Sequence, residues 1–162
     1  MSAALTSLAK AGFGLALVTF GIDQVHKWIM IGPVDIANTQ PIRVAPFLDL
    51  VMAWNKGVSY GWFAQDTDLG RWLLIALAVA ITLYLCVWLM RATTRLSALG
   101  LGLLIGGALS NALDRVVHGA VADFFAFHGF GYSWYVFNLA DVAIVAGVVA
   151  LLYDSLVDGS KP

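Results

Sequence analysis

The sequence predicts an all-α membrane protein with a small β element, built from four transmembrane helices. Two observations predict this class. Of the 162 residues, 60% are hydrophobic and only 12% are charged, against about 25% charged in an average soluble domain, and the mean hydropathy is +0.84. The chain also contains four separate apolar stretches. A soluble domain of this size could not bury so much apolar surface, since small domains leave much of their surface in water.

A helix needs about 20 predominantly apolar residues to cross a bilayer. Four stretches meet this requirement, at residues 5–31, 72–90, 96–113 and 134–153. The first ends with Asp23 and Lys27, four residues apart with the acid first, which is the order that pairs well on a helix. No small-residue cleavage site precedes a soluble domain. We therefore expect this stretch to be a retained span and not a cleaved signal peptide.

The loop of residues 32–71 is expected to hold the β element. Residues 47–54 form an apolar, β-prone run, and residues 58–63 form another. The break between them, Asn55-Lys56-Gly57, has the composition of a tight turn. The sequence therefore predicts a hairpin, whose aromatic residues suit the membrane–water interface.

Basic residues predict the orientation in the membrane. The short link between the second and third stretches holds Arg91 and Arg95, and Lys10 flanks the first stretch. By the positive-inside rule, this link and both termini lie in the cytoplasm. The loop 32–71 also carries basic residues, but charges in long loops weigh less. We expect this loop and the segment after Asp114 to lie outside.

Several function classes are excluded by composition. A net charge of −1 offers no basic field for nucleic acid. Cys86 is the only cysteine, so neither an internal disulfide nor a cysteine-cluster metal site can form. The three His residues lack metal-ligand spacing, and Ser59 and Ser110 lack a His/Asp arrangement for nucleophilic catalysis. We therefore expect no metal and no cofactor.

Polar side chains in or beside the spans are the functional candidates, because such groups are costly in a bilayer. They form three groups at the outer ends of the third and fourth spans: Asn111 with Asp114 and Arg115, Asn138 with Asp141, and Asp123. Spacings of three and four residues put the members of a group on one helix face. We expect the three groups to converge.

Some candidates have a structural alternative. These are an ion pair for Asp114 with Arg115, another for Asp23 with Lys27, and a helix–helix hydrogen bond for Asn111. Asp141 has no cation three or four residues away, and Asp123 is flanked by apolar residues. Two unpaired carboxyl groups beside one interface are typical of a shared-proton pair.

Such a pair has defined chemistry. Two like charges about 3 Å apart cannot both ionise, so one pKa rises and the other falls. One carboxylate then acts as a base on water while the other group protonates the carbonyl or the leaving amine. The alternative is a proton-coupled transporter or channel subunit, which would spread its charges through the membrane depth and show an internal repeat. A purely structural scaffold leaves Asp141 unexplained.

Five short blocks carry a resemblance to a known family. They are Asp23-Gln24-Val25-His26-Lys27, Asn55-Lys56-Gly57-Val58-Ser59-Tyr60-Gly61, Gly106-Gly107-Ala108-Leu109-Ser110-Asn111-Ala112-Leu113-Asp114-Arg115, Val121-Ala122-Asp123-Phe124 and Phe137-Asn138-Leu139-Ala140-Asp141. In this order they resemble lipoprotein signal peptidase (signal peptidase II), a bacterial membrane aspartyl peptidase, over nearly the whole chain. Two positions depart from the family: His26 stands where Ser is usual, and Tyr60 where Phe is usual.

The resemblance implies a fold of four transmembrane helices plus an extracytoplasmic β-cradle. It implies that Asp123 and Asp141 are catalytic. It further implies substrate-binding roles for Asn55, Asn111, Arg115 and Asn138, and supporting roles for Asp23, Lys27, Gly57 and Asp114. The implied partners are membrane lipid and a prolipoprotein substrate that is cut just before its diacylglyceryl-modified Cys. A cyclic-peptide inhibitor of the globomycin type is also implied, as is a monomer in the bacterial cytoplasmic (inner) membrane whose active site faces the extracytoplasmic side.

Overall fold

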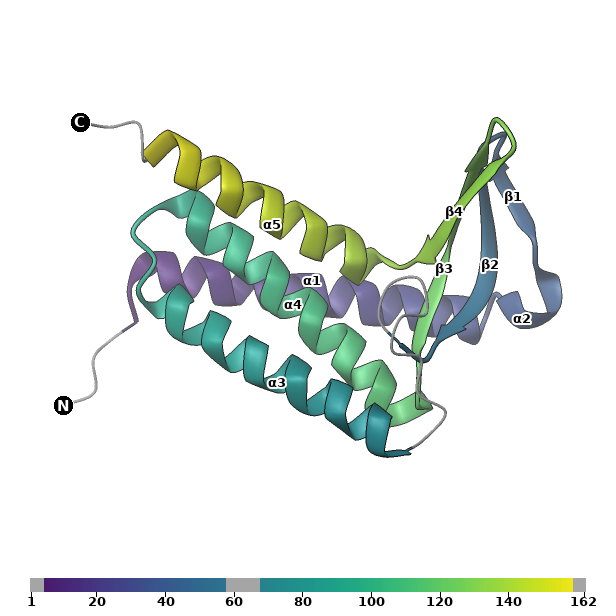
Figure 1. Cartoon of the computed structure of the whole chain (residues 1–162), viewed down its shortest axis with the longest axis horizontal. Coiled ribbons are helices and arrows are strands. Elements are labelled where there is room, and N and C mark those ends of the chain that lie inside the picture. The colour runs from purple at the N-terminus through teal and green to yellow at the C-terminus, as the bar shows by residue number, and fades with distance from the viewer. Residues whose placement is uncertain (1–4, 58–67, 159–162) are drawn as a thin grey trace.

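Four long apolar helices confirm the predicted fold class. The structure is a computed structural model that describes residues 5–57 and 68–158. The helices long and apolar enough to cross a membrane are α1 (Ser7–Ile31), α3 (Asp68–Met90), α4 (Arg95–His118) and α5 (Leu139–Asp158). They run alongside one another, and α1 begins at the same end of the bundle at which α5 ends (Figure 1).

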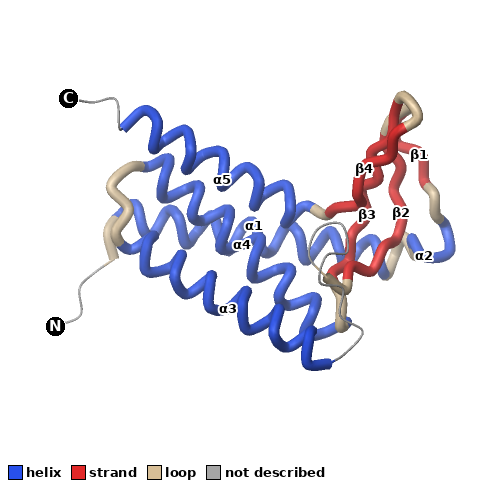
Figure 2. Tube along the Cα trace, viewed as in Figure 1, coloured by secondary structure: helices blue, strands red, loops and turns tan. Residues whose placement is uncertain are grey.

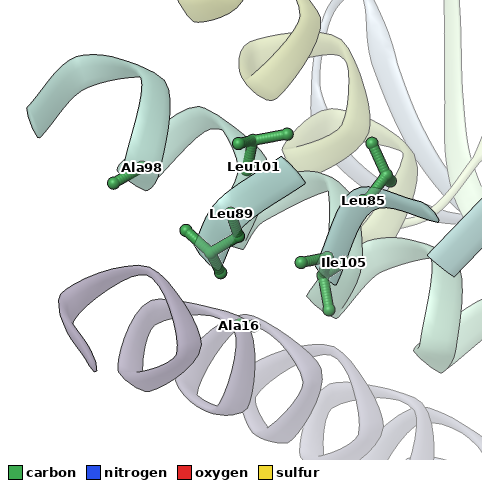
Figure 3. Packing of buried hydrophobic residues seen from close by; sticks show 6 residues of the cluster. All are labelled: Ala16, Leu85, Leu89, Ala98, Leu101 and Ile105. Atoms are coloured by element: carbon green, nitrogen blue, oxygen red, sulfur yellow. The ribbon is translucent and has the colours of Figure 1, made fainter. Parts of the chain in front are cut away.

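Helix α4 lies at the centre of the bundle and packs against the other three helices. In its most apolar window 50% of the residues are buried, against 11–22% in the other spans. Glycines allow this close packing, because a Cβ on Gly106 would lie 2.5 Å from the carbonyl oxygen of Ala16 in α1. A Cβ on Gly107 would lie 2.7 Å from the carbonyl oxygen of Ala140 in α5. Leu89 of α3 is fully buried in the core shared by α1, α3 and α4 (Figure 3).

A four-stranded antiparallel sheet stands across one end of the bundle (Figure 2). In spatial order its strands are β1 (Ile42–Ala45), β2 (Leu48–Asn55), β3 (Val121–Gly129) and β4 (Tyr132–Phe137). The short helix α2 (Ile36–Thr39) leads from α1 into β1. Met30 of α1, Ile36 of α2 and Phe124 of β3 are buried together and fix the sheet to the C-terminal end of α1.

The β element is larger than the sequence predicts. The β-prone run 47–54 corresponds to β2, which pairs with β1 and β3. The second run of the expected hairpin, residues 58–63, lies outside the described residues. At the intervening break, Asn55 Oδ1 accepts a hydrogen bond from the backbone N–H of Gly57 at 3.0 Å, which is the local bond of an Asx turn.

The fourth span starts later than expected. Residues 134–137 lie in β4, and α5 begins at Leu139. The β3–β4 hairpin turns at Phe130 and Gly131, with φ of 51° and 79°. A two-residue hairpin turn of type I′ needs positive φ at both positions, and glycine adopts it without strain. Gly131 was thus the available sequence signal for this hairpin, and hydropathy alone assigned the second half of β4 to the span.

Candidate active site

Asp123 and Asp141, which the sequence predicts to converge, are joined in the structure by one asparagine. Asp123 lies on β3 and is 2% exposed, while Asp141 lies in the first turn of α5. The side-chain Nδ2 of Asn138 donates to Asp123 Oδ1 at 2.6 Å, and the backbone N of Asn138 donates to Asp141 Oδ2 at 3.2 Å. Strand β3 and helix α5 therefore place their two carboxyl groups on the same asparagine.

The start of α5 fixes this arrangement. Asn138 Oδ1 accepts from the backbone N of Asp141 at 2.9 Å, while Asp141 Oδ2 accepts from the backbone N of Asn138. Two reciprocal bonds of this kind form a capping box, which satisfies N–H groups that have no partner inside the helix. The spacing Asn-x-x-Asp was the sequence signal for this helix start.

Burial and like charge act on Asp123. Desolvation is the larger cause and the nearby charge of Asp141 the second, and together they raise the pKa of Asp123 to about 7. Hydrogen bonds from Asn138 and from Asn55, whose Nδ2 lies 3.2 Å from Asp123 Oδ2, oppose this rise in pKa, as does the charge of Lys27. Asp123 is therefore partly protonated near neutral pH.

Two more predicted site residues, Asn111 and Arg115, border the carboxyl pair. Asn111 Nδ2 donates to Asp141 Oδ1 at 2.9 Å. Arg115 donates from Nη2 to the carbonyl oxygen of Gly57 at 2.7 Å, and from Nη1 to the carbonyl oxygen of Asn111 at 3.2 Å. Its Nε is buried and has no hydrogen-bond partner among residues 5–57 and 68–158. The guanidinium thus links Gly57, two residues after the end of β2, to α4.

Asp23, Lys27 and Asp114, to which the resemblance gives supporting roles, form a buried cluster beside this pair. Lys27 Nζ lies 2.7 Å from Asp23 Oδ2 and 2.7 Å from Asp114 Oδ2. It also donates to Asn111 Oδ1 at 3.2 Å, so all three ammonium donors are used. The structural pairing expected for Asp23 with Lys27 is present. The pairing considered for Asp114 with Arg115 is not, because Lys27 of α1 reaches into the bundle while Arg115 turns toward Gly57.

Two residues of this cluster were missed at the level of sequence: Gln24 and Ser110. Gln24 Nε2 donates to Ser110 Oγ at 2.8 Å and to Asp114 Oδ1 at 2.9 Å. The signal was available, because Gln24 is three residues from Lys27 and Ser110 is four from Asp114, so each shares a helix face with an ionisable residue.

Two hollows meet at Asp141. A cavity of about 240 Å³ has a polar wall made by Asn55, Gly57, Asn111, Arg115 and Asp141. A larger groove of about 540 Å³ is lined mainly by aromatic and aliphatic side chains from the sheet and α5, and Asp141 also lines it. Within residues 5–57 and 68–158, no three His, Cys, Asp or Glu side chains are grouped as a metal site would require. The site therefore places Asp141 between a polar and an apolar hollow, with the buried Asp123 joined to it through Asn138.

Comparison with known proteins decides the family. The family model described as signal peptidase (SPase) II matches residues 15–157 of this chain. The chain belongs to the signal peptidase II family. The lipoprotein signal peptidase of Methylorubrum extorquens (strain PA1) is 53% identical over 148 residues, which cover 91% of this chain and 86% of that protein. The lipoprotein signal peptidase of Nitrobacter hamburgensis is 51% identical over 150 residues, 90% of this chain and 92% of that protein.

A solved structure of the same architecture supports this membership of the signal peptidase II family. A bacterial membrane enzyme determined by the in meso method at 2.3 Å resolution matches with a TM-score of 0.80 and 27% identity, over 93% of this chain and 90% of that one. The resemblance read from the five sequence blocks is confirmed. With four apolar helices and a membrane enzyme as its structural neighbour, this member of the family is a multi-pass membrane protein.

Proposed function

We propose that this chain is a membrane aspartic endopeptidase that removes signal peptides from diacylglyceryl-modified prolipoproteins, cutting just before the lipidated Cys. The observation that carries the proposal is the pairing of Asp123 and Asp141 around Asn138. In the described part of the chain, neither carboxyl group lies within ion-pair distance of a Lys, Arg or His. Two carboxyl groups so placed are available for acid–base work.

The proposed mechanism assigns complementary roles to the pair. Asp123, whose pKa is raised to about 7, supplies a proton to the scissile carbonyl oxygen. Asp141 takes a proton from a water molecule, whose oxygen attacks the carbonyl carbon. Asp141 then returns that proton to the leaving nitrogen as the C–N bond breaks. The tetrahedral intermediate collapses to a carboxylic acid and returns the first proton to Asp123.

Polar residues of the cavity would hold the substrate backbone. Asn55 and Arg115 line the same hollow as Asp141, and the free Nε of Arg115 is a donor for a peptide carbonyl. Asn111 and Asn138 use their amide donors on the catalytic carboxyl groups. We therefore assign the latter two mainly to orienting the carboxyl pair.

The apolar groove supports a lipidated substrate. Its lining includes Phe127 and Phe137 from the sheet and Val142 and Val145 from α5. Burial of an acyl chain contributes about 0.8 kcal/mol per CH₂. Such a chain would bring the modified Cys next to Asp141, where the groove meets the polar cavity.

The proposed location is the bacterial inner membrane, with the active site on the extracytoplasmic side. The carboxyl pair and the sheet lie at the end of the bundle opposite the α3–α4 link (Figure 1). That link carries Arg91 and Arg95, which favour the cytoplasm. Buried charges cluster at the sheet end, whereas a proton-coupled transporter would need them through the membrane depth. A monomer would suffice, and a cyclic peptide of the globomycin type would compete for the cavity.

Replacement of the two carboxyl groups tests the proposal. Asp123→Asn and Asp141→Asn keep the size of each side chain but remove its ionisable group. We expect either change to lower cleavage of a diacylglyceryl-modified precursor in detergent by about a thousandfold or more. The double variant should be little worse than either single variant, because groups that act as a unit are not additive.

Two controls separate this mechanism from others. Cys86→Ala and Ser59→Ala should keep near-normal activity, because no covalent nucleophile is needed. A chelator should leave cleavage unchanged. Near-normal activity of Asp141→Asn, or loss of cleavage on addition of chelator, would contradict the aspartic assignment.

A further inference from the structure

A closed ring of hydrogen bonds lies behind the candidate catalytic pair. Its members are Asp23, Gln24, Lys27, Ser110 and Asp114. On one side Lys27 bridges the two acids at 2.7 Å each. On the other side the Ser110 hydroxyl donates to Asp23 Oδ2 at 2.6 Å, and Gln24 Nε2 donates to Ser110 Oγ at 2.8 Å and to Asp114 Oδ1 at 2.9 Å. The two acids are thus linked twice, once by a cation and once by a neutral bridge.

Each acid of the ring also binds the backbone next to one catalytic candidate. Asp23 Oδ1 accepts from the backbone N of Ala140 at 2.9 Å, one residue before Asp141. Asp114 Oδ2 accepts from the backbone N of Ala122 at 3.1 Å, and the residue after Ala122 is the other catalytic candidate. A shift or rotation of either acid would therefore move the backbone that carries a catalytic carboxyl group. The geometry of the ring sets the spacing of the pair.

The neutral bridge restrains the two carboxylates of Asp23 and Asp114 more than Lys27 alone does. The ammonium group of Lys27 uses its three donors on Asp23, Asp114 and Asn111, and it contacts only Oδ2 of each acid. Besides Lys27 and the backbone N–H groups, Ser110 adds a third bond to Asp23. Gln24 likewise adds a third bond to Asp114, at Oδ1, which neither Lys27 nor the backbone N of Ala122 contacts. Ser110 is 0% exposed, so no water would replace its hydroxyl without rearrangement of the helices.

We propose that Ser110 and Gln24 are positioning residues, whose neutral bridge between Asp23 and Asp114 holds the catalytic carboxyl pair at its working separation. This inference rests on the proposed function, because it presumes that the two carboxyl groups act together. Neither Ser110 nor Gln24 lines the cavity beside Asp141. The bridge therefore affects the rate of the chemical step and not the binding of substrate.

Single and double substitutions test the bridge in the full-length enzyme in detergent, with a synthetic diacylglyceryl precursor peptide as substrate. Ser110→Ala removes the hydroxyl, and Gln24→Met keeps the length of the side chain but removes both donors. We expect each to lower kcat by about tenfold and to leave KM within about twofold, since a small misplacement of reacting groups is costly. The double variant should match the single variants, because either change breaks the same bridge.

A matched control is Ser97→Ala, which removes a buried hydroxyl from the other end of α4 and should leave kcat unchanged. The melting temperatures of all variants are measured first, so that activity is assayed at a temperature at which each variant is folded. If Ser110→Ala does not fold, Gln24→Met, at a half-buried position, tests the bridge by itself.

Asp141→Asn is measured in parallel. If it is inactive while Ser110→Ala and Gln24→Met keep wild-type kcat, the positioning role is wrong and the proposed function stands. Losses that multiply in the double variant, or a rise in KM at constant kcat, also contradict the positioning role. An active Asp141→Asn would overturn both proposals.

Discussion

At the scale of single residues, Asp123 should make cleavage depend on pH. Its pKa is raised to about 7 by burial and then by the charge of Asp141, and the proposed mechanism needs it protonated. The rate should therefore fall as pH rises through about 7, while the group loses its proton. Measurement of kcat from about pH 5 to about pH 9 checks this.

Asn55 provides the control for that pH profile. Its hydrogen bond to Asp123 lowers the pKa, so Asn55→Ala should move the alkaline limb to higher pH. A rate that stays constant between about pH 6 and about pH 9 would contradict the role given to Asp123.

Arg115 should not be replaceable by lysine. Its guanidinium contacts two carbonyl oxygens, those of Gly57 and Asn111, whereas a lysine ammonium is a point charge that cannot reproduce this planar geometry. We expect Arg115→Lys to keep the melting temperature within a few degrees and to lower kcat/KM by about tenfold to a hundredfold. Arg91→Lys, at the opposite end of the bundle, should match wild type. Normal turnover by Arg115→Lys would show that charge alone is sufficient.

At the scale of elements, the close contact of α4 with α5 determines where Asp141 lies. A Cβ on Gly107 would meet the carbonyl oxygen of Ala140 at 2.7 Å and a side-chain carbon of Ile144 at 2.8 Å. Gly107→Ala should therefore push the first turn of α5 away from α4 and lower both stability and cleavage. The destabilisation should be of order 1–3 kcal/mol, the usual cost of overpacking.

Gly21→Ala on α1 is the matched control, since nothing lies within 4 Å of its added Cβ. It should be neutral or slightly stabilising, because alanine has the higher helix propensity. Thermal unfolding and cleavage measured on the two variants test the packing argument. Equal behaviour of Gly107→Ala and Gly21→Ala would show that the α4–α5 contact can relax without affecting the site.

At the scale of the whole molecule, the site lies at the sheet end of an apolar bundle, next to an apolar groove. Substrate should enter sideways from the bilayer and not from water. A precursor without its diacylglyceryl group should be cut much more slowly, because it loses the acyl-chain burial of about 0.8 kcal/mol per CH₂. Initial rates with one lipidated and one unlipidated peptide of the same sequence measure this difference. Equal rates would exclude a lipid-dependent entry.

Hydropathy and short spacings determined much of this protein from sequence alone. The four spans follow from apolar length, because a bilayer demands about 20 such residues in any helix. The pairing of Asp23 with Lys27 follows from their i,i+4 spacing and is present at 2.7 Å. Asp123 and Asp141 stood out because each is a carboxyl group in an apolar setting with no cation nearby in the sequence. All of these signals are local along the chain.

Tertiary structure decided which groups meet. Asp114 is next to Arg115 in sequence, yet it pairs with Lys27, because packing of α1 against α4 brings that ammonium group between two buried acids. The expected span 134–153 included the end of β4 and the Asn138 cap, and strand pairing and helix capping place the start of α5 at Leu139. Spacing rules place side chains on one face of one element. Whether Asp123 on β3 meets Asp141 on α5 depends instead on how closely α4, with its glycines, packs against α5. No single stretch of sequence specifies this packing.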